Sequence, residues 1–312
     1  MSTTDLLFII LQVFLILLFS PLLQGIIKKT KAFLQSRKGP SIWQGYYDLV
    51  KYFRKSIVLS EDSSWITKSA PYLVFSAILV SSSLVVTFFL SDFRGNGTDI
   101  LILIYLFAFA RFFTSLVGFD AASSFGGMGS SREATVSIFA EPALFIAIFS
   151  YSYQTGFLSF DSVIQQLNIT GFQWFNPTLF FSFIAMMILL ITETGRIPID
   201  NPDTHLELTM IHEGMLLEFT GRHLAMMTWA HWMKEMVLMS MVASFFLPFE
   251  VDFMSWSGVF INFVLYLVKV VGIGIVLAFV EMAFAKIRFF KIPKLLGVSM
   301  IFSILAFVSN ML

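Results

Sequence analysis

The sequence predicts an all-α integral membrane protein with about eight transmembrane helices and one amphipathic helix on the cytoplasmic membrane surface. Of its 312 residues, 57% are hydrophobic and 13% are charged, so most of the chain cannot form a soluble globule with a charged surface. Apolar runs of about 20 residues, the length that crosses a hydrocarbon core as a helix, recur along the sequence. The alternating pattern and regular turns of a membrane β-barrel are missing.

Eight apolar runs are predicted to span the membrane as one polytopic domain covering residues 1–312. The first run has no basic segment before it, is too long for a secretory signal and lacks a small-residue cleavage site, so we expect it to be retained as a helix. The predicted spans are residues 5–27, 70–92, 99–118, 133–153, 177–194, 222–247, 257–280 and 293–312.

The distribution of basic residues predicts the orientation. Nine of the 20 Lys and Arg residues lie between the first two runs, and the positive-inside rule therefore makes residues 28–69 a basic cytoplasmic loop. The loops expected on the other side carry a single basic residue, Arg94. Because successive spans cross the membrane in alternating directions, the acidic loop, residues 195–221, is also expected in the cytoplasm. Both termini are then expected on the external side of the inner (cytoplasmic) membrane.

Within the basic loop, aromatic and apolar residues recur at near-helical spacing, which indicates an amphipathic helix lying on the inner surface. An ordinary interfacial anchor is an equally good interpretation of this pattern alone. The residues concerned are Trp43, Tyr46, Tyr47, Val50 and Phe53.

Cysteine is absent from the chain, which removes disulfides, thiolate nucleophiles and thiolate-bound iron-sulfur or nickel sites from this polypeptide. His205 and His212 share a helical face, but about 10.5 Å of rise separates them, too far for joint ligation of one metal. We expect them to be solvated or to face a partner, and His223 and His231 to pack or cap a helix. No metal or cofactor site is therefore predicted in this chain.

The glycine-rich segment 125–131 follows a predicted membrane helix and no strand, so its context excludes a phosphate-binding loop. Gly126, Gly127 and Gly129 lead us to expect a flexible cytoplasmic turn.

Ionisable residues inside the predicted spans are the most informative feature. A charge at the centre of a bilayer costs about 2.5 to 3.5 kcal/mol on insertion scales, so it needs a partner or a wet cavity. Both signs occur in similar numbers, and the set can compensate itself. Its members are Arg111, Glu133, Glu141, Glu193, Lys234, Glu235, Lys269 and Glu281.

Glu133 and Glu141 are separated by about 80° around an ideal helix and about 12 Å along it, so both can face one crevice at different depths. Buried carboxylates near Lys and Arg are suited to exchanging protons. We hypothesise that Glu141, Glu193, Lys234, Lys269 and Glu281 line a buried polar axis that conducts or gates protons. The alternative is a set of static ion pairs that fix helix packing.

Four stretches carry recognisable motifs. The first contains Gln35, Ser36, Arg37, Lys38, Gly39 and Pro40, followed by Gln44, Asp48 and Lys51. The second pairs Arg132 with Glu141. The third contains Glu193, Arg196, Pro198, Asp200, Pro202 and Asp203, then Glu207 and the run from Glu218 to Gly221. The last contains Glu281, Lys286 and Arg288.

In order and spacing, these stretches resemble the family of the complex I subunit that joins the hydrophilic arm to the membrane arm, with its homologues in membrane-bound hydrogenases. The resemblance implies an eight-helix fold whose cytoplasmic loops dock partner subunits. The implied docking residues are Arg37, Lys38, Gly39, Pro40, Gln44, Asp48, Lys51, Arg196 and Arg288. It also implies an acidic entrance into the membrane formed by Glu193, Asp200, Asp203, Glu207, Glu213 and Glu218.

Departures from the quinone-reducing members indicate a branch. The acidic loop is longer and is similar to that of the hydrogenases, and Ile27 stands near the place where quinone-reducing relatives carry a Glu before the first motif. The arrangement around Glu281 again resembles formate hydrogenlyase. The resemblance thus favours the membrane subunit of an energy-converting nickel-iron hydrogenase of the formate hydrogenlyase type.

That interpretation implies a non-catalytic chain whose partners are a hydrogenase large subunit, iron-sulfur subunits, antiporter-like membrane subunits and the lipid bilayer, with no nucleic acid. The nickel-iron centre and the iron-sulfur clusters are expected in those partners. A quinone-reducing complex I subunit and a stand-alone ion transporter remain the alternatives. The coupled ion, the electron donor and the direction of the reaction are left open by the sequence.

Overall fold

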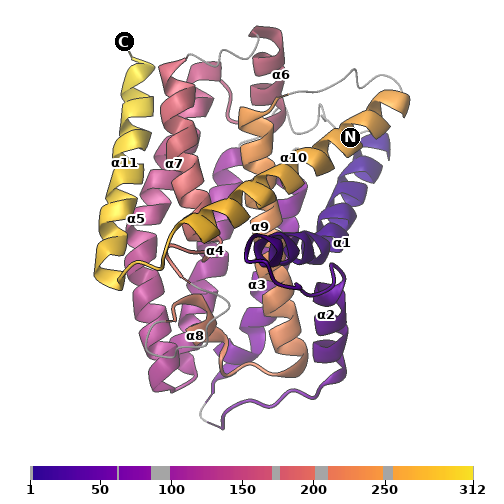
Figure 1. The fold of residues 1–312 in the computed structure, drawn as a ribbon, viewed down its shortest axis with the longest axis vertical. Coiled ribbons are helices and arrows are strands. Elements are labelled where there is room, and N and C mark those ends of the chain that lie inside the picture. Colours follow the sequence, from indigo (N-terminus) through magenta and orange to yellow (C-terminus); the bar gives the residue numbers. More distant parts are fainter. Residues whose placement is uncertain are drawn as a thin grey trace.

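The computed structural model describes residues 3–61, 63–85, 99–170, 176–200, 210–248 and 256–311, and no strand occurs among them (Figure 1). The all-α prediction is therefore confirmed for this part of the chain. The helices are α1 (Thr3–Leu34), α2 (Gln44–Arg54), α3 (Trp65–Leu84), α4 (Asp99–Asp120), α5 (Ser124–Thr155), α6 (Phe160–Thr170), α7 (Pro177–Glu193), α8 (His212–Leu216), α9 (Gly221–Phe246), α10 (Trp256–Ala283), the short 3₁₀ helix η2 (Phe289–Lys291) and α11 (Ile292–Ser309).

Five segments of the described chain are long and apolar enough to cross a membrane: α1, α4, α5, α10 and the stretch that ends with α11. Helix α7 is apolar but shorter. Helices α3 and α9 also lie where spans are predicted, so eight helices match the eight predicted runs, although length and composition support five of them as spans. Lys234, Glu235 and His231 lower the hydropathy of α9, and the second half of that helix is buried in the bundle.

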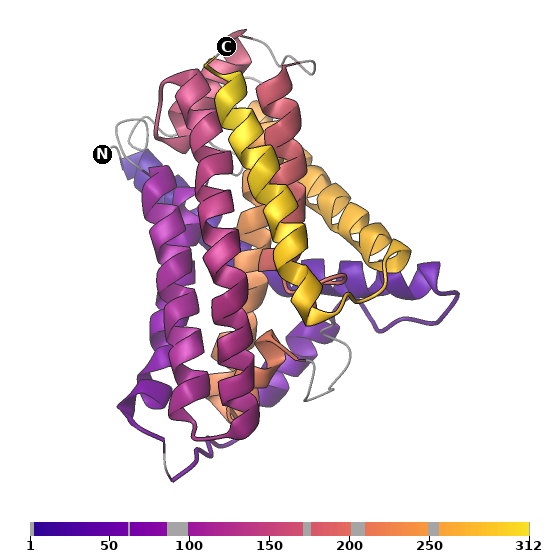
Figure 2. The ribbon, with the colours of Figure 1, turned by 90° about the vertical axis from the view of Figure 1, so that its left-hand side faces the viewer.

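Helix α1 contains Pro21, and the helix bends so that its C-terminal part runs away from the bundle axis (Figure 2). Proline lacks an N–H, so the carbonyl of Leu17 loses its helical donor. The indole N–H of Trp229 on α9 donates to that carbonyl at 3.0 Å, and the hydroxyl of Tyr46 donates to the carbonyl of Leu18. The bend is therefore stabilised by side chains from two neighbouring helices.

After the bend, α1 continues to Leu34, beyond the predicted end of the span at residue 27. The first residues of the predicted basic loop are thus helical. Residues Gln24 to Lys31 of this extension turn a buried face toward α9 and α10, and this face contributes to the site described below.

Helix α2 occupies the place of the predicted amphipathic helix. Gly45 and Leu49 are buried, whereas Tyr47 and Val50 are exposed. A Cβ on Gly45 would lie 2.8 Å from the carbonyl oxygen of Pro21, so glycine is required for α2 to rest against the bend of α1.

The prediction of a flexible turn at residues 125–131 is wrong, because these residues are part of α5. Their glycines serve close packing. A Cβ on Gly118 of α4 would lie 2.1 Å from Oγ of Ser130, and a Cβ on Gly129 would lie 2.9 Å from the carbonyl of Ile211. The absence of side chains lets α4, α5 and the start of α8 approach one another, and this approach brings α8 against the C-terminal end of α4 and the N-terminal end of α5.

Helix α9 runs through the middle of the bundle and contacts α1, α2, α3, α7 and α10. Helices α5, α7 and α11 pack together beside it, as do α3, α4 and α5. Helix α6 lies between the predicted spans 133–153 and 177–194, in one of the loops expected on the side of the membrane opposite the basic loop. Both termini lie at the end of the bundle opposite α2 and α8 (Figure 1).

Candidate functional site

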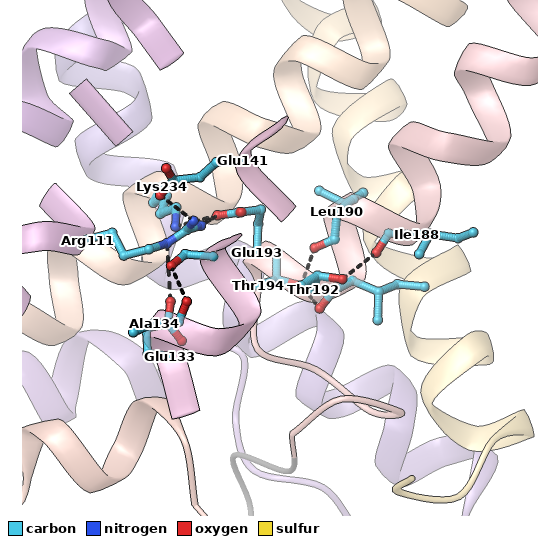
Figure 3. A network of polar contacts seen from close by, with 12 residues as sticks. Arg111, Glu133, Ala134, Glu141, Ile188, Leu190, Thr192, Glu193, Thr194 and Lys234 are labelled. Atoms are coloured by element: carbon cyan, nitrogen blue, oxygen red, sulfur yellow. Dashed lines mark hydrogen bonds and ion pairs between the residues drawn. The ribbon is translucent and has the colours of Figure 1, made fainter. Parts of the chain in front are cut away.

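A buried ion cluster joins α4, α5, α7 and α9, and we call it the Arg111 cluster. Nη1 of Arg111 lies 2.8 Å from Oε1 of Glu141, and Nε lies 3.2 Å from Oε1 of Glu133. Its Nη2 donates to Oε2 of Glu193, which also accepts from Nζ of Lys234 at 2.8 Å (Figure 3). As their spacing on α5 predicts, Glu133 and Glu141 face one crevice and bind the same guanidinium.

The Arg111 cluster extends from the interior to the lateral surface of the chain. The side chain of Glu193 is 1% exposed, whereas that of Glu141 is 40% exposed. Glu141 lines an open groove between α4 and α5, together with Tyr105, Ser137 and Phe145. Charges buried in low dielectric are tolerated when they are paired, so the cluster can hold ionised groups within the bundle while one carboxylate remains accessible from the side.

A second cluster, the Arg196 cluster, lies beside the first. Nε and Nη2 of Arg196 bind the two carboxylate oxygens of Glu235 at 3.1 and 3.2 Å. Nη1 of Arg196 donates to Glu281 at 2.6 Å, and Nη2 donates to Oε1 of Gln24 at 2.9 Å. Lys31 reaches the other oxygen of Glu281 at 2.5 Å. Arg196, which the resemblance assigns to partner docking, is thus 4% exposed and lies at the centre of a buried network.

The end of α7 positions a central residue of each cluster, Glu193 in the first and Arg196 in the second. Glu193 is the last residue of the helix, and the chain turns at Gly195, whose φ of 59° is a left-handed conformation that favours glycine. The hydroxyls of Thr192 and Thr194 donate to the carbonyls of the preceding turn (Figure 3). Arg196 then points into the second cluster, so one short segment carries a central residue of each.

The described part of the acidic loop is fixed through Asp200. One oxygen of this buried carboxylate accepts from the backbone N–H groups of Ile211 and His212 at 3.1 and 3.4 Å. The other accepts from Nζ of Lys286 at 2.8 Å. Asp200 therefore joins the turn after α7 to the start of α8 and to the segment after α10.

The other acidic residues of the predicted entrance are not buried as Glu193 and Asp200 are, or lie outside the described part of the chain. Glu213 on α8 and Glu218 just after it are partly exposed, whereas Asp203 and Glu207 lie outside the described residues. Arg132, part of the second motif, donates to the carbonyl of Met210 at 2.8 Å and so holds the chain where it enters α8.

Lys269 belongs to neither cluster. It lines a cavity of about 510 Å³ between α7, α9 and α10, and the other residues around this cavity are apolar, among them Phe183, Met187 and Phe246. The structure therefore brings Glu141, Glu193, Lys234 and Glu281 of the predicted axis into the two clusters and places Lys269 apart from them. Spacing along α10 could not show this, because the tilt of that helix decides which neighbours each residue meets.

Most residues of the first motif lie at the surface of the chain. Arg37, Lys38, Pro40 and Lys51 are exposed, as is Arg288 in the last motif, and Gly39 is half-buried. Gln44 donates to Asp48 at 2.9 Å across one turn of α2. Burial raises the pKa of Tyr52 on this helix, and the nearby carboxylates of Asp48 and Glu213 raise it further, which shows that the acidic start of α8 lies near α2.

Two histidines belong to the site and were not expected there. The rings of His212 and His231 stack with their centroids 4.4 Å apart and their planes inclined by 28°. Nε2 of His212 is buried although the residue as a whole is partly exposed, so its ring faces the interior as well as the surface. The sequence could have indicated only His231 as a site residue, because it lies one helical turn before Lys234 and Glu235 and so shares a face of the helix with them. Among the described residues, no group of three or more His, Cys, Asp or Glu side chains could hold a metal ion.

Gln24 and Lys31 are further site residues that sequence reasoning missed. They are two helical turns apart and lie on one face of α1. The expectation that the helix ends at residue 27 concealed this relationship, because it placed Lys31 in a loop.

Long apolar helices packed around paired interior charges define an integral membrane subunit of the helical-bundle type. The chain belongs to the NADH dehydrogenase family, whose family model matches residues 6–311. This membership confirms the resemblance inferred from the four motifs.

Relatives with high coverage are named as hydrogenase components. The chain is 32% identical to hydrogenase-4 component C of Escherichia coli K12 over 91% of its own length and 89% of that protein. It is 29% identical to formate hydrogenlyase subunit 4 of the same organism, over 96% and 97% of the two chains. Identity to NADH-quinone oxidoreductase subunit 8 of Rhodothermus marinus is 24%, over 72% of this chain and 69% of that protein.

The fold is also found in a solved respiratory assembly. A chain of the membrane-bound sulfane sulfur reductase, an archaeal respiratory membrane complex, superposes with a TM-score of 0.81 at 19% identity, covering 97% of this chain and 99% of that chain. At this identity the likeness shows the fold alone.

Proposed function

We propose that this chain is the membrane-anchoring, proton-pathway subunit of an energy-converting nickel-iron hydrogenase of the formate hydrogenlyase type. The observation that carries the proposal is the Arg111 cluster, which places an interior carboxylate, Glu193, and a laterally accessible one, Glu141, on the same guanidinium. The near full-length similarity to two hydrogenase components supports the hydrogenase assignment.

The proposed path begins at the acidic loop, residues 195–221, where the partly exposed carboxylates of Glu213 and Glu218 would face the hydrophilic partners. It passes through the Arg196 cluster, whose central residue belongs to the loop, and then to the Arg111 cluster. Glu141 ends the path at the side groove between α4 and α5. An antiporter-like membrane subunit covering that groove would receive the proton.

The proposed mechanism is electrostatic and conformational. Electron transfer to protons at a neighbouring catalytic site changes the charge near residues 193–221, and this change alters the balance of the ion pairs next to it. Protonation of Glu193 weakens its attraction to both Arg111 and Lys234, which releases these cations toward Glu133 and Glu141. The chain itself makes or breaks no substrate bond, and the nickel-iron centre and iron-sulfur clusters reside in its partners.

The membrane arrangement follows from the same proposal. Eight helices, α1, α3, α4, α5, α7, α9, α10 and α11, span the bilayer, with α2 on the cytoplasmic surface and both termini outside. The surface residues of the first motif and Arg288 then face the cytoplasm, where the hydrogenase large subunit and iron-sulfur subunits dock.

The quinone-reducing alternative rests on the family relatives that reduce quinone, and these cover less of both chains. Ile27, at the place where those relatives are expected to carry a carboxylate, is fully buried, and it packs against Gly274 of α10. An apolar side chain sealed between α1 and α10 offers no polar contact to a quinone headgroup. This local packing favours the hydrogenase branch.

Two experiments test the proposal. Affinity purification from native membranes is expected to recover a nickel-iron protein and iron-sulfur proteins with this chain; a quinone-reductase partner set would indicate the complex I alternative, and isolation alone would indicate a transporter. In vesicles containing the assembled complex, Glu141→Gln is expected to abolish coupled proton movement. Unchanged proton movement at normal assembly would favour static ion pairs.

A further inference from the structure

His212 and His231 lie where the two ion clusters meet. His212 is the first residue of α8, and its backbone N–H is bound by Asp200. His231 precedes Lys234 of the Arg111 cluster and Glu235 of the Arg196 cluster by one helical turn, and its Nε2 lies 3.8 Å from Oε1 of Glu235. The stacked imidazoles are therefore next to residues of both networks.

An internal cavity adjoins the two rings. It has a volume of about 60 Å³ and is lined by His212, His231, Lys234 and Glu193, with Arg111 and Glu133 at its other side. Since a water molecule needs about 10 to 15 Å³ of volume measured in this way, the cavity has room for several waters.

Two polar atoms in the lining residues call for such waters. Nε2 of His212 and Oε1 of Glu193 are buried and make no hydrogen bond to any residue that the structure describes. Buried nitrogen and oxygen atoms in folded proteins are almost always hydrogen-bonded, and leaving one unsatisfied costs about 1 to 3 kcal/mol. Water in the cavity can satisfy both atoms and so connect the imidazole to the carboxylate.

We propose that His212, His231 and the waters of this cavity form a relay that passes protons between the Arg196 cluster and the Arg111 cluster. The inference rests on the proposed proton-pathway function and adds the connection that the ion pairs alone lack. An imidazole accepts a proton at one ring nitrogen, forming an N–H bond, and releases the proton of the other nitrogen, breaking one. Cavity water carries that proton to Oε1 of Glu193.

The surroundings suit one proton at a time. Two positively charged rings with centroids 4.4 Å apart would repel each other strongly, so the geometry favours one extra proton on the pair at a time. Three cations and four carboxylates surround the pair, so one added positive charge on the imidazoles would balance the set. These groups are Arg111 on α4, Glu133 on α5, Glu193 at the end of α7, Arg196 and Asp200 after it, and Lys234 and Glu235 on α9.

The test measures protons moved per catalytic turnover by the assembled complex in proteoliposomes. His212→Phe and His231→Phe keep a flat ring that can stack but carry no exchangeable proton. His223→Phe is the matched control, since His223 is also a buried residue of α9 but contacts Tyr72 and Phe219 and does not line the cavity. Each relay variant is expected to lower the proton yield at least about tenfold, whereas the control keeps the wild-type yield.

Chemical rescue separates a proton carrier from a packing residue. Added imidazole is expected to restore proton movement in His231→Ala and to leave His223→Ala unchanged. If the Phe variants fail to assemble, His212→Gln and His231→Gln, which retain a polar side chain, replace them. The same loss of proton yield is expected.

A wild-type proton yield in the variants of both histidines would overturn the relay. Glu193→Gln, measured in parallel, distinguishes this result from failure of the pathway itself. If Glu193→Gln alone loses proton movement, the pathway stands without the histidines; if it also retains the wild-type yield, the proposed function fails.

Discussion

Lys234 and Glu235 are consecutive residues of α9, yet each binds a different residue at the end of α7: Lys234 binds Glu193 at 2.8 Å, and Glu235 binds Arg196 at 3.1 Å. Successive side chains of a helix point about 100° apart, so one helix can address two neighbouring sites. The pair therefore couples the two clusters mechanically, because any shift of α9 against the end of α7 changes both at once.

Removing the centre of the Arg196 cluster is expected to destabilise the protein strongly. Arg196→Met leaves the buried carboxylates of Glu235 and Glu281 without their shared partner, and breaking a buried ion pair from one side costs about 3 to 5 kcal/mol. Thermal unfolding of the purified complex would show a lower Tm and a smaller assembled fraction. Arg222→Met, at an exposed position that belongs to neither cluster, is the control and is expected to leave the Tm unchanged; equal Tm values for both variants would contradict the role of Arg196 as a buried cluster centre.

The bend of α1 gives a second prediction. Trp229→Phe keeps an aromatic ring but removes the N–H that binds the carbonyl freed by Pro21, so the free energy of unfolding is expected to fall by about 1 to 3 kcal/mol. Denaturant or thermal unfolding measures the loss. Trp43→Phe, an exposed aromatic residue of the same type, should have little effect on stability, and a similar loss in both variants would show that the indole hydrogen bond does not stabilise the bend.

The glycines of α4 and α5 allow a matched comparison. Gly118→Ala places a Cβ 2.1 Å from Oγ of Ser130 and 2.7 Å from the carbonyl of Gly126, whereas a Cβ on Gly127 meets nothing within 4 Å. Gly118→Ala is therefore expected to lower the yield of folded protein, measured by size-exclusion chromatography in detergent. Gly127→Ala should be neutral or should stabilise the helix by up to about 1 kcal/mol. The reverse order of yields would show that α4 and α5 do not pack as closely as described.

The sequence predicts much of the fold because its signals are local. Runs of apolar residues locate α4, α7, α10 and α11 to within a few residues, and the spacing of Glu133 and Glu141 correctly predicts that they face one crevice. The errors occur where distant contacts decide. The glycines before Arg132 read as a turn, yet they form helix because α4 and α8 pack against them.

The site was predicted in part for the same reason. Charges within apolar runs identify the members of both clusters, since an unpaired charge there is costly. They do not reveal which residues meet. Three features depend on how the helices are placed in space: the separation of Lys269 from the others, the burial of Arg196 and the stacking of His212 on His231. Spacing along the chain does not contain that information.

The central claim is that the buried clusters carry protons, and Glu193→Gln tests it most directly. The variant keeps the shape and the hydrogen-bonding oxygen of a side chain that is 1% exposed but cannot exchange a proton in the same way. Glu61→Gln, at an exposed carboxylate, is the control. With the complex assembled and reconstituted in vesicles, we expect Glu193→Gln to eliminate turnover-linked proton translocation while Glu61→Gln retains it. Translocation at the wild-type level in Glu193→Gln would contradict the account.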